Sequence, residues 1–425
     1  MSKKQLKIAV VGLGYVGFPL ALEFAGKGIE VVGIEIDSDR LKDITNRRSY
    51  ITDITSLELK AALARGNFKA SANFSDIKEA DAVFICVPTP LKGRNLPDIS
   101  FIKNAVKAVS LHIKKGALVV LESTTYPGTT EEEILPIFQK RGLKHGRDFY
   151  LCFSPERIDP GNKKFPIHRI PKVVGGISPE ATRMGESLYR IIIKQVVPVS
   201  SCRCAETVKL LENTFRLINI GLIDELSMMA HKMRIDIWEV VRAAATKPFG
   251  FMPFYPGPGV GGHCIPKDPL YLYWKAKSFG FNSRFIKLAS DIINHMPEYT
   301  VKRIEEALSS HAKKLKGARI LVLGVTYKKD VKDLRQSPGI EVIRALRKRG
   351  AVVCYSDPFI PFLKLNDIDL RSVVLSNQNI KMFDCILIAA DHSSVDYKGL
   401  LKSAKLIFDS RNVFKGIHKE KVERL

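Results

Sequence analysis

The sequence lacks a long apolar run. None of its 425 residues falls in an uninterrupted apolar stretch of about 18 residues, the length that indicates a membrane span. The opening MSKKQLKIAVVGLGYVG has no apolar segment that ends at a small-residue cleavage site. Hydrophobic residues make up 45% and charged residues 26% of the chain, as in ordinary globular proteins. We therefore expect a cytoplasmic protein of two or three domains with no membrane partner.

The chain also lacks the cysteine spacing of a disulfide scaffold or a zinc site. Its seven cysteines are scattered along the chain, and only Cys202 and Cys204 lie close together. No second CxxC or HxxxH pattern accompanies them, so four zinc ligands cannot be assembled from the pattern. We expect reduced thiols and no metal.

Acidic residues are scarce relative to basic ones. Asp and Glu number 44 against 67 Lys and Arg, which gives a formal net charge of +23. Such a surplus is typical of proteins that bind nucleic acid, anionic membranes or anionic small molecules. The basic residues are spread along the whole chain and no nucleic-acid module is recognisable, so we expect no nucleic-acid partner.

What the chain does contain begins with a strand, a glycine turn and a helix. The apolar run KIAVV (7–11) leads into a GxGxxG turn and then a helical pattern through Gly26. A second strand ends on Glu35, 18 residues beyond Gly17. In this context the glycines admit a pyrophosphate to the helix N-terminus, and the acid hydrogen-bonds the ribose hydroxyls. The turn residues expected at the cofactor are Gly12, Leu13, Gly14, Tyr15, Val16 and Gly17.

The acidic residue selects the cofactor. A carboxylate at the end of the second strand repels a 2′-phosphate, so Glu35 favours NAD over NADP. Asp37 is the alternative acid, although it lies two residues beyond the strand. Arg40 is expected near the adenosine ribose.

Strands alternate with helices along most of the chain, which indicates mainly parallel sheets. We predict an α/β protein with two doubly wound, Rossmann-like domains, joined by a long central helix and a helical connector domain. The helical stretch covers about 203–245, with further helices to about 310. The predicted domains are an NAD-binding domain (1–200), a helical connector and dimerisation domain that carries the cysteine loop (201–312), and an α/β substrate domain (313–425).

Threonines follow two of the predicted strands. Thr89, Thr124 and Thr125 lie in loops at the expected carboxyl edge of the first sheet, where ligands of this architecture bind. Two interpretations stay open, because these side chains either contact the cofactor or cap the following helices.

The long helix carries a polar stripe. Glu206, Lys209, Asn213 and Arg216 are spaced by three, four and three residues, so they share one face. Such a stripe is either a solvated face with internal ion pairs or, among the apolar residues around it, the lining of a pocket.

The stretch PGPGVGGHCIPKDP (256–269) surrounds one cysteine with glycines. It is either a tight turn around a buried thiol or a loop that presents Cys264 as a nucleophile.

Five motifs, in order along the chain, decide between the two interpretations of the Cys264 loop. GLGYVG (12–17), SPERIDPG (154–161), ETVKLLENTFR (206–216), GPGVGGHCIPKDP (257–269) and YKKDVKDLRQS (327–337) together resemble the nucleotide-sugar 6-dehydrogenases. The resemblance extends from residue 7 to about 415. In that family, two NAD molecules oxidise C6 of a UDP-linked sugar to a carboxylate, and the resemblance implies the same reaction here.

The resemblance also implies catalytic roles. Cys264 would add to the intermediate aldehyde, so that the thiohemiacetal can be oxidised to a thioester. Lys209 and Asn213 would stabilise the developing oxyanion. Asp268 would position or deprotonate water, with Glu156 as a second carboxylate near the thioester.

The matched positions further imply a substrate site and an assembly. The nucleotide sugar would be held by Arg157, Ile158, Arg216, Tyr255, Gly261, Lys328, Lys329, Arg335 and Arg411. Basic side chains suit its diphosphate. His263 has no assigned role, because neighbours in sequence often point apart. We expect a homodimer or higher homo-oligomer.

The identity of the sugar rests on smaller features. Family members that act on UDP-glucose usually carry an arginine shortly before the glycine run, and PFGFMPFYPGPGVGG (248–262) has none. This stretch, with His263 and YLYWKA (271–276), resembles the branch that oxidises UDP-N-acetylglucosamine. Lys267 is more typical of the UDP-glucose branch, and UDP-N-acetylmannosamine is a further alternative.

Two other classes of protein share this architecture. A non-catalytic nucleotide-binding regulator would keep the glycine turn and Glu35 but would not need Cys264, Lys209 and Asp268 together. A hydroxyacid dehydrogenase transfers one hydride and needs no nucleophilic cysteine.

Overall fold

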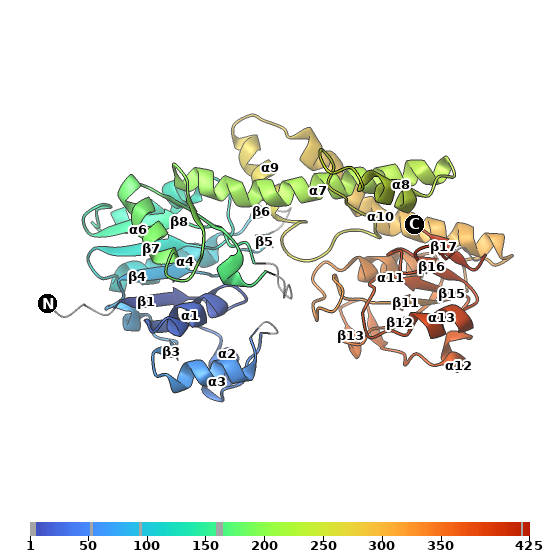
Figure 1. Ribbon diagram of the computed structural model, residues 1–425, viewed down its shortest axis with the longest axis horizontal. Helices are drawn as coiled ribbons and strands as arrows, with labels where there is room; N and C mark the ends of the chain where they lie inside the picture. The colour runs from blue at the N-terminus through green and yellow to red at the C-terminus, as the bar shows by residue number, and fades with distance from the viewer. Residues whose placement is uncertain (1–5, 52–53, 93–95, 159–164, 418–419) are drawn as a thin grey trace. The chain divides into compact units, whose positions relative to one another are not determined.

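The computed structural model of the chain describes residues 6–51, 54–92, 96–158, 165–417 and 420–425 (Figure 1). These residues form two compact units, and neither unit is a single stretch of chain. Unit 1 comprises Met1–Glu212 and Leu270–Phe281, and unit 2 comprises Asn213–Pro269 and Asn282–Leu425. Helices α7 (Cys202–Lys232) and α9 (Asp268–Ser278) contribute residues to both units.

Unit 1 is built on an eight-stranded sheet with the order β10-β9-β8-β7-β4-β1-β2-β3. Every neighbouring pair is parallel except β8 and β9. The strands are β1 (Lys7–Val11), β2 (Glu30–Ile34), β3 (Phe68–Ser71), β4 (Ala82–Ile85), β7 (Ala117–Leu121), β8 (Phe149–Phe153), β9 (Lys172–Gly176) and β10 (Val196–Pro198), and β5 (Leu91–Lys92) pairs separately with β6 (Leu96–Pro97). The strand order reverses between β1 and β4, so a ligand crevice is expected outside their carboxyl ends.

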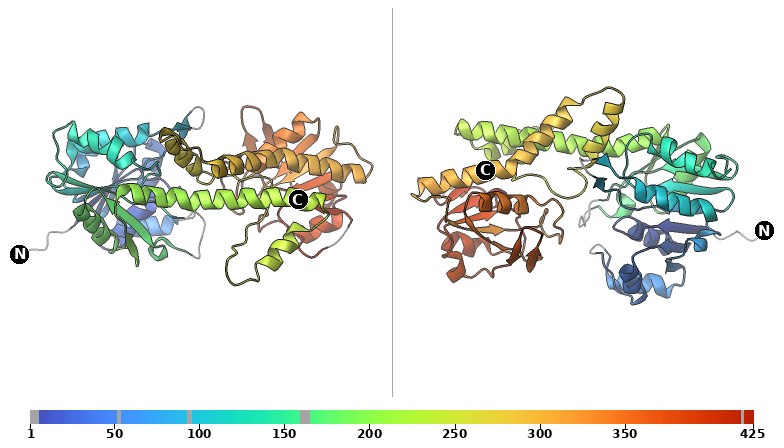
Figure 2. Two further views of the ribbon diagram at one scale, coloured as in Figure 1. Left: turned by 90° about the horizontal axis from the view of Figure 1, so that it is seen from above. Right: turned by 180° about the vertical axis from the view of Figure 1, so that it is seen from behind.

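Helices cover both faces of this sheet (Figure 2). The strands read as nearly continuous apolar runs because both of their faces are buried. Helices α1, α3 and α6 pack on one face, and α4 and α5 pack on the other. The helices are α1 (Gly17–Gly26), α2 (Ser38–Thr45), α3 (Ser56–Ala64), α4 (Ser100–His112), α5 (Leu135–Gln139) and α6 (Pro179–Tyr189), with short turns η1 (Phe74–Ile77), η2 (Thr130–Ile134) and η3 (Ile167–Arg169).

Unit 2 contains a smaller parallel sheet with the order β12-β11-β15-β16-β17. Helices α10 and α11 pack on one face, while α12 and α13 pack on the other. The elements are α8 (Ile237–Ala244), α10 (Arg284–Ser310), β11 (Arg319–Leu323), α11 (Pro338–Lys348), β12 (Val352–Ser356), α12 (Asn377–Ile380), β15 (Cys385–Ile388), α13 (Tyr397–Ser403), β16 (Ile407–Asp409) and β17 (Val422–Arg424), and β13 (Phe362–Lys364) pairs with β14 (Asp369–Arg371). The two doubly wound sheets and the long helix α7 confirm the predicted fold class.

The helical stretch expected over about 203–245 is two helices rather than one. Helix α7 ends at Lys232, and Arg234 adopts a left-handed conformation with φ 59°. The Asp236 carboxylate then accepts hydrogen bonds from the backbone N–H groups of Trp238 and Glu239, which starts α8. The break was missed because neither proline nor glycine marks it.

Within the described residues, no helix combines the length and the apolar character required to cross a membrane. The seven cysteines all belong to that part of the chain, and none of them is bonded to another.

Candidate active site

The glycine turn follows β1, at the point where the strand order of the unit 1 sheet reverses. Gly12 has φ 90°, and a Cβ there would stand 2.8 Å from the carbonyl oxygen of Cys86. A Cβ on Gly17 would stand 2.0 Å from the carbonyl oxygen of Gly12, whereas no atom lies within 4 Å of a Cβ on Gly14. Two glycines therefore permit the tight turn, and the third leaves open space beside it.

Glu35 faces this turn. Its side chain is 6% exposed, and its carboxylate accepts hydrogen bonds from the backbone N–H of Leu13 at 3.1 Å and from Arg40 Nη1 at 3.2 Å. Asp37 instead caps α2, because its carboxylate accepts from the N–H groups of Asp39 and Arg40. This geometry supports Glu35 as the ribose-binding acid.

The turn fits a dinucleotide. Helix α1 begins directly after it, with no side-chain cap and no acidic residue in its first turn. The first N–H groups of a helix without such partners attract a phosphate. Gly12, Leu13, Gly14, Tyr15 and Val16 line the approach to this helix end, so these residues and Glu35 would hold NAD.

None of the three predicted threonines caps the helix that follows it. The caps of α4 and η2 are Ile99 and Thr129. Thr89 is buried, and its carbonyl oxygen accepts a hydrogen bond from Tyr271 at 2.5 Å. Thr125 is also buried and shares a 2.6 Å hydrogen bond with Thr129, while Thr124 is half-buried. The capping interpretation is therefore wrong for these residues.

Glu156 lies in the loop after β8 and is held from both sides. Its Oε1 accepts hydrogen bonds from the backbone N–H groups of Arg157 and Ile158, each at 2.6 Å. Its Oε2 accepts from Lys172 Nζ at 2.9 Å. Arg157 itself pairs with Glu212 at 2.5 Å and donates to the carbonyl of Pro171.

The polar stripe on α7 is solvated only in part, since Glu206 and Asn213 are buried. Glu206 is fully buried and accepts hydrogen bonds from the backbone N–H groups of Gly128 and Thr130 at 2.6 and 2.8 Å. Burial raises the pKa of its carboxyl to about 7. Glu206 thus anchors the start of the helix, whereas Lys209 is half-buried and Arg216 is exposed.

Asn213 and Asp268 form a buried pair within unit 2. Asn213 Nδ2 donates to Asp268 Oδ2 at 2.6 Å, and the two residues are 4% and 2% exposed. Asp268 is the first residue of α9, where a carboxylate is favoured by the helix dipole. Two of the predicted catalytic residues are therefore in direct contact.

Cys264 is exposed at the end of the glycine loop. Its carbonyl oxygen accepts the backbone N–H groups of Lys267 at 3.1 Å and Asp268 at 2.8 Å, which turns the chain into α9. Four other cysteines, at 86, 152, 202 and 385, are buried. The buried-thiol interpretation of Cys264 is therefore wrong.

The glycine loop lies against the YKKDVKDLRQS segment. The Gly262 N–H donates to the carbonyl of Arg335 at 2.8 Å, and a Cβ on Gly261 would stand 2.6 Å from the carbonyl oxygen of Gln336. Burial lowers the pKa of Lys267, and repulsion by Arg335 adds to the effect, although Asp268 and Cys264 oppose it. Two cations therefore lie near the thiol.

The segment starts at the switch point of the second sheet, between β11 and β15. Lys328 and Lys329 follow β11, and Lys329 pairs with Asp391, which follows β15, at 3.3 Å. Nε2 of His392 lies 3.1 Å from both Thr326 Oγ1 and Asp357 Oδ2, which ties the loop after β11 to the residues that follow β12 and β15. Neither His392 nor Asp357 was identified from the sequence.

A basic cavity of about 300 Å³ brings Tyr255 and Arg411 together. Trp238 stacks on Tyr255 with ring centroids 5.8 Å apart. Arg242 and Lys415 complete its charged lining. Three cations beside two aromatic rings suit an anion that carries a flat group.

Two buried side chains that hold candidate site residues in place, Asp224 and Lys172, were not identified from the sequence. Asp224 on α7 is fully buried and accepts the Gly257 N–H of the glycine loop at 3.1 Å. Lys172 Nζ lies 2.8 Å from Glu122 Oε2 as well as 2.9 Å from Glu156. Charged residues inside otherwise apolar strands, as in PKVVGG and LVVLES, were the available signal.

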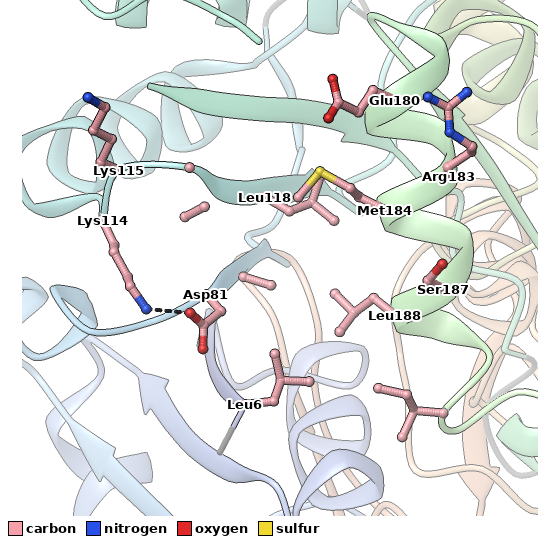
Figure 3. A pocket seen from close by; sticks show the side chains of 14 residues that line it. Leu6, Asp81, Lys114, Lys115, Leu118, Glu180, Arg183, Met184, Ser187 and Leu188 are labelled. Atoms are coloured by element: carbon pink, nitrogen blue, oxygen red, sulfur yellow. Dashed lines mark hydrogen bonds and ion pairs between the residues drawn. The ribbon is translucent and has the colours of Figure 1, made fainter. Parts of the chain in front are cut away.

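A larger cavity, of about 610 Å³, lies at the amino edge of the unit 1 sheet. Figure 3 shows Leu118, Met184 and Leu188 in its wall and an ion pair between Lys114 and Asp81. Some of its lining residues lie at the starts of β4 and β7, whereas the predicted cofactor residues follow β1, β2, β4 and β7 at the carboxyl edge. This cavity is therefore at the edge of the sheet opposite the expected cofactor site.

Comparisons with known proteins agree with this architecture. Residues 6–193, 203–295 and 321–416 match, in order, the NAD binding domain, the central domain and the UDP binding domain of the UDP-glucose/GDP-mannose dehydrogenase family. The UDP-N-acetyl-D-glucosamine 6-dehydrogenase of Pseudomonas aeruginosa is 37% identical over 95% of this chain and 94% of its own.

Solved structures give the same result. A UDP-D-ManNAc dehydrogenase from Pyrococcus horikoshii is 35% identical with a TM-score of 0.89, and covers 99% of each chain. A UDP-glucose dehydrogenase from Pyrobaculum islandicum is 27% identical with a TM-score of 0.87, over 99% of this chain and 98% of its own. The chain therefore belongs to the UDP-glucose/GDP-mannose dehydrogenase family and is an NAD-dependent sugar-nucleotide dehydrogenase.

Proposed function

We propose that the protein oxidises C6 of UDP-N-acetylglucosamine to the carboxylate in two steps, through a covalent adduct on Cys264. The observation that carries this proposal is the exposed Cys264 thiol in a glycine loop, with Lys267, Arg335 and the Asn213–Asp268 pair around it. A one-step hydroxyacid dehydrogenase or a non-catalytic regulator has no use for a nucleophile in such surroundings.

The reaction begins at the C6 alcohol. NAD, when bound, accepts a hydride from C6 in each of the two oxidations. In the first, the alcohol gives up this hydride from C6, releases its O6 proton to water, and becomes an aldehyde. Lys209 and Asn213, one helical turn apart on α7, stabilise the oxygen as it becomes anionic.

Cys264 makes the second oxidation feasible. An aldehyde has no second hydride to give until a nucleophile adds to its carbonyl. The Cys264 thiolate forms the new C–S bond, and oxidation of this thiohemiacetal leaves a thioester. Lys267 and Arg335 favour the thiolate, because nearby cations stabilise a negative sulfur.

Water completes the reaction. Its oxygen attacks the thioester carbonyl, the C–S bond breaks, and the sulfur leaves as thiolate. Asp268 positions this water or accepts its proton, with Glu156 as the second carboxylate. Asn213 holds Asp268 through the 2.6 Å hydrogen bond, which fixes the direction of the carboxylate.

The nucleotide sugar would be held by the basic side chains of the predicted set. Lys328, Lys329 and Arg335 follow the switch point of the second sheet, where ligands of doubly wound folds bind. Arg411 and Tyr255 line the basic cavity described above, and its cations suit a diphosphate. Arg157, Ile158, Arg216 and Gly261 complete the set.

The choice of sugar rests on the segment 248–262, which carries no arginine. An acetamido group needs room where a guanidinium would stand. The named relatives act on different UDP-sugars, so UDP-N-acetylmannosamine and UDP-glucose are the alternatives.

A substrate panel tests both the reaction and the sugar. UDP-glucose and the UDP-linked N-acetyl derivatives of glucosamine, mannosamine and galactosamine are each mixed with NAD, and absorbance of the reduced cofactor is followed. We expect UDP-N-acetylglucosamine to have the highest kcat/KM and to yield two reduced cofactors per sugar. A UDP-glucose maximum would reverse the choice of sugar, and one reduced cofactor per sugar would refute the two-step reaction.

Cys264→Ser tests the covalent step. The serine hydroxyl is nearly the same size but a much poorer nucleophile at neutral pH, so binding survives and acid formation stops. Oxidation to the aldehyde can continue at a reduced rate. Mass spectrometry of the sugar product is the measurement, and Cys204→Ser, at another exposed cysteine, is the matched control. Uronic acid formed by Cys264→Ser at the parent rate would refute the nucleophile assignment.

The predicted homodimer or higher homo-oligomer and the cytoplasmic location belong to the same proposal. Exposed apolar side chains on α7, including Leu211 (61%), Leu222 (49%) and Met229 (50%), support association through this helix. Light scattering measures the assembly, and a monomer at micromolar concentration would refute it.

A further inference from the structure

Four buried side chains in unit 1 form a hydrogen-bonded group, the Lys172 cluster, which links Glu156 to three side chains that the proposed reaction does not use. They are Lys172, Glu122, Glu156 and Tyr189. Lys172 Nζ donates to Glu122 Oε2 at 2.8 Å and to Glu156 Oε2 at 2.9 Å. The Tyr189 hydroxyl donates to the other oxygen of Glu122. The side chains of Lys172 and Glu122 are 5% and 0% exposed.

The topology of the sheet creates this cluster. Glu122 follows β7, and Glu156 lies in the loop that follows β8, so both lie at the carboxyl edge. Strand β9 runs antiparallel to β8, and Lys172 is its first residue. The reversal brings the start of β9 to the carboxyl edge, whereas a parallel strand would begin at the opposite one. The reversed strand thus delivers a lysine to two carboxylates.

We propose that Lys172 is a positioning residue that keeps Glu156 ionised and fixes the direction of its Oε2, with Glu122 and Tyr189 holding Lys172 in place. This inference rests on the proposed role of Glu156 in thioester hydrolysis. With Oε1 fixed by two backbone N–H groups and Oε2 by one ammonium, the carboxylate has little freedom to rotate.

The charges in the cluster are consistent with this role. Burial is the largest single influence and raises the pKa of Glu156, but the charge and hydrogen bond of Lys172, with smaller contributions from the Ile158 N–H and Lys209, together hold the pKa below its usual value. Burial raises the pKa of Glu122 to about 7, with a contribution from Glu156. One cation is shared by two buried carboxylates, so Glu122, whose pKa is raised, takes up a proton more readily than Glu156, whose pKa is lowered.

Other titratable groups face the cluster from neighbouring elements. Lys209 on α7 also lowers the pKa of Glu156, so removal of Lys172 weakens the stabilisation of the carboxylate without abolishing it. Cys86 after β4 and Cys152 on β8 lie near Glu122, and burial raises the pKa of both thiols, which keeps them neutral.

The test follows hydrolysis of the Cys264 thioester in a single turnover of UDP-N-acetylglucosamine with excess NAD, by quenching and intact mass, from pH 3.5 to 9. Four variants are compared with the parent. Lys172→Met removes the cation that the two carboxylates share. Glu122→Gln removes the second carboxylate that Lys172 contacts, and the double variant combines the two changes. Lys114→Met, which removes the lysine of the Asp81 ion pair at the opposite edge of the same sheet, is the matched control.

Lys172→Met should move the acidic limb of the hydrolysis profile to higher pH by roughly one to three pH units, with the rate recovering above that limb. Glu122→Gln should leave the limb in place or move it to lower pH, because Lys172 still pairs with Glu156 and any negative charge on Glu122 that opposes ionisation of Glu156 is removed. The double variant should behave like Lys172→Met, and Lys114→Met like the parent. If Lys172→Met does not fold, the double variant compared with Glu122→Gln makes the same test.

Equal losses of rate at every pH in Lys172→Met and Glu122→Gln would overturn the inference, because they would indicate a purely structural role. An unchanged limb in Lys172→Met and the double variant would overturn it too. A parent protein that forms no thioester and no acid would instead refute the proposed function itself, so the two failures are distinguishable.

Discussion

Asn213→Asp is the substitution that most directly tests the buried pair in unit 2. In the parent, the Asn213 amide donates to Asp268 at 2.6 Å, with both residues nearly inaccessible to solvent. The variant replaces the donor nitrogen with an oxygen of almost the same size. Two carboxylates then face each other where one hydrogen bond stood, and they cannot both be ionised without a large penalty.

The penalty follows from the short distance. Two unit charges about 4 Å apart repel by about 4 kcal/mol at an effective dielectric constant near 20. If the pair keeps one proton, an O–H···O bond replaces the lost one, and the cost falls to about 1–2 kcal/mol. The shared proton is bound more tightly in the folded state than in the unfolded state, so stability falls as pH rises above about 4.

We expect the variant to lose about 1–2 kcal/mol of unfolding free energy at pH 4, where the pair keeps its proton, and about 4 kcal/mol at pH 8. At pH 8 this corresponds to a fall of about 10 °C in Tm for a unit of this size. Thermal unfolding followed by circular dichroism at the two pH values measures it. The double variant Asn213→Asp/Asp268→Asn restores one amide and one carboxylate, so stability should return while acid formation does not.

A variant as stable as the parent at both pH values would show that the hydrogen bond does not form. Acid formation by the double variant at the parent rate would show that the position of the carboxylate, at 268 rather than 213, has no part in catalysis.

Two further predictions concern unit 1. Burial raises the folded-state pKa of Glu206 to about 7, so ionisation of this group should cost the parent up to about 3 kcal/mol of unfolding free energy as pH rises from about 4.5 to 7. Urea unfolding at pH 5 and pH 8 measures this loss, and Glu206→Gln should not show it. The parent should prefer NAD to NADP by at least about 100-fold in kcat/KM, and Glu35→Ser should narrow this ratio more than Asp37→Ser, which removes the cap of α2 and a 3.7 Å ion pair with Arg40 but leaves the Glu35 carboxylate in place. A parent that uses both cofactors equally would contradict the second prediction.

The features that depend on local pattern were predictable. Short apolar runs located β1, β4, β7 and β11, because strands buried on both faces must be apolar along their whole length. The fold class and the NAD cofactor follow from such runs and from the glycine turn.

The features that depend on distant contacts were not. Lys172 and Glu122 are 50 residues apart, and only the reversed strand β9 brings them together. Glu206 shares a helical face with Lys209. Nothing in the local pattern shows that its carboxylate is buried and binds backbone N–H groups 76 and 78 residues away. Helix periodicity identifies a face, whereas the partner of that face is set by tertiary packing.

The discontinuity of unit 1 has a consequence for how the protein is made. Its last segment, Leu270–Phe281, brings Tyr271 to the carbonyl of Thr89, a hydrogen bond between residues 182 positions apart, and packs Trp274 against Tyr126. A ribosome extends a chain at roughly 5–20 residues per second, so an emerging unit 1 waits on the order of ten seconds or more between the synthesis of residue 126 and that of residue 271. During that interval the surfaces of Thr89 and Tyr126 have no α9 to cover them. Pulse proteolysis of stalled nascent chains should therefore find the chain at Thr89 and at Tyr126 cleavable until α9 has emerged, and protected afterwards.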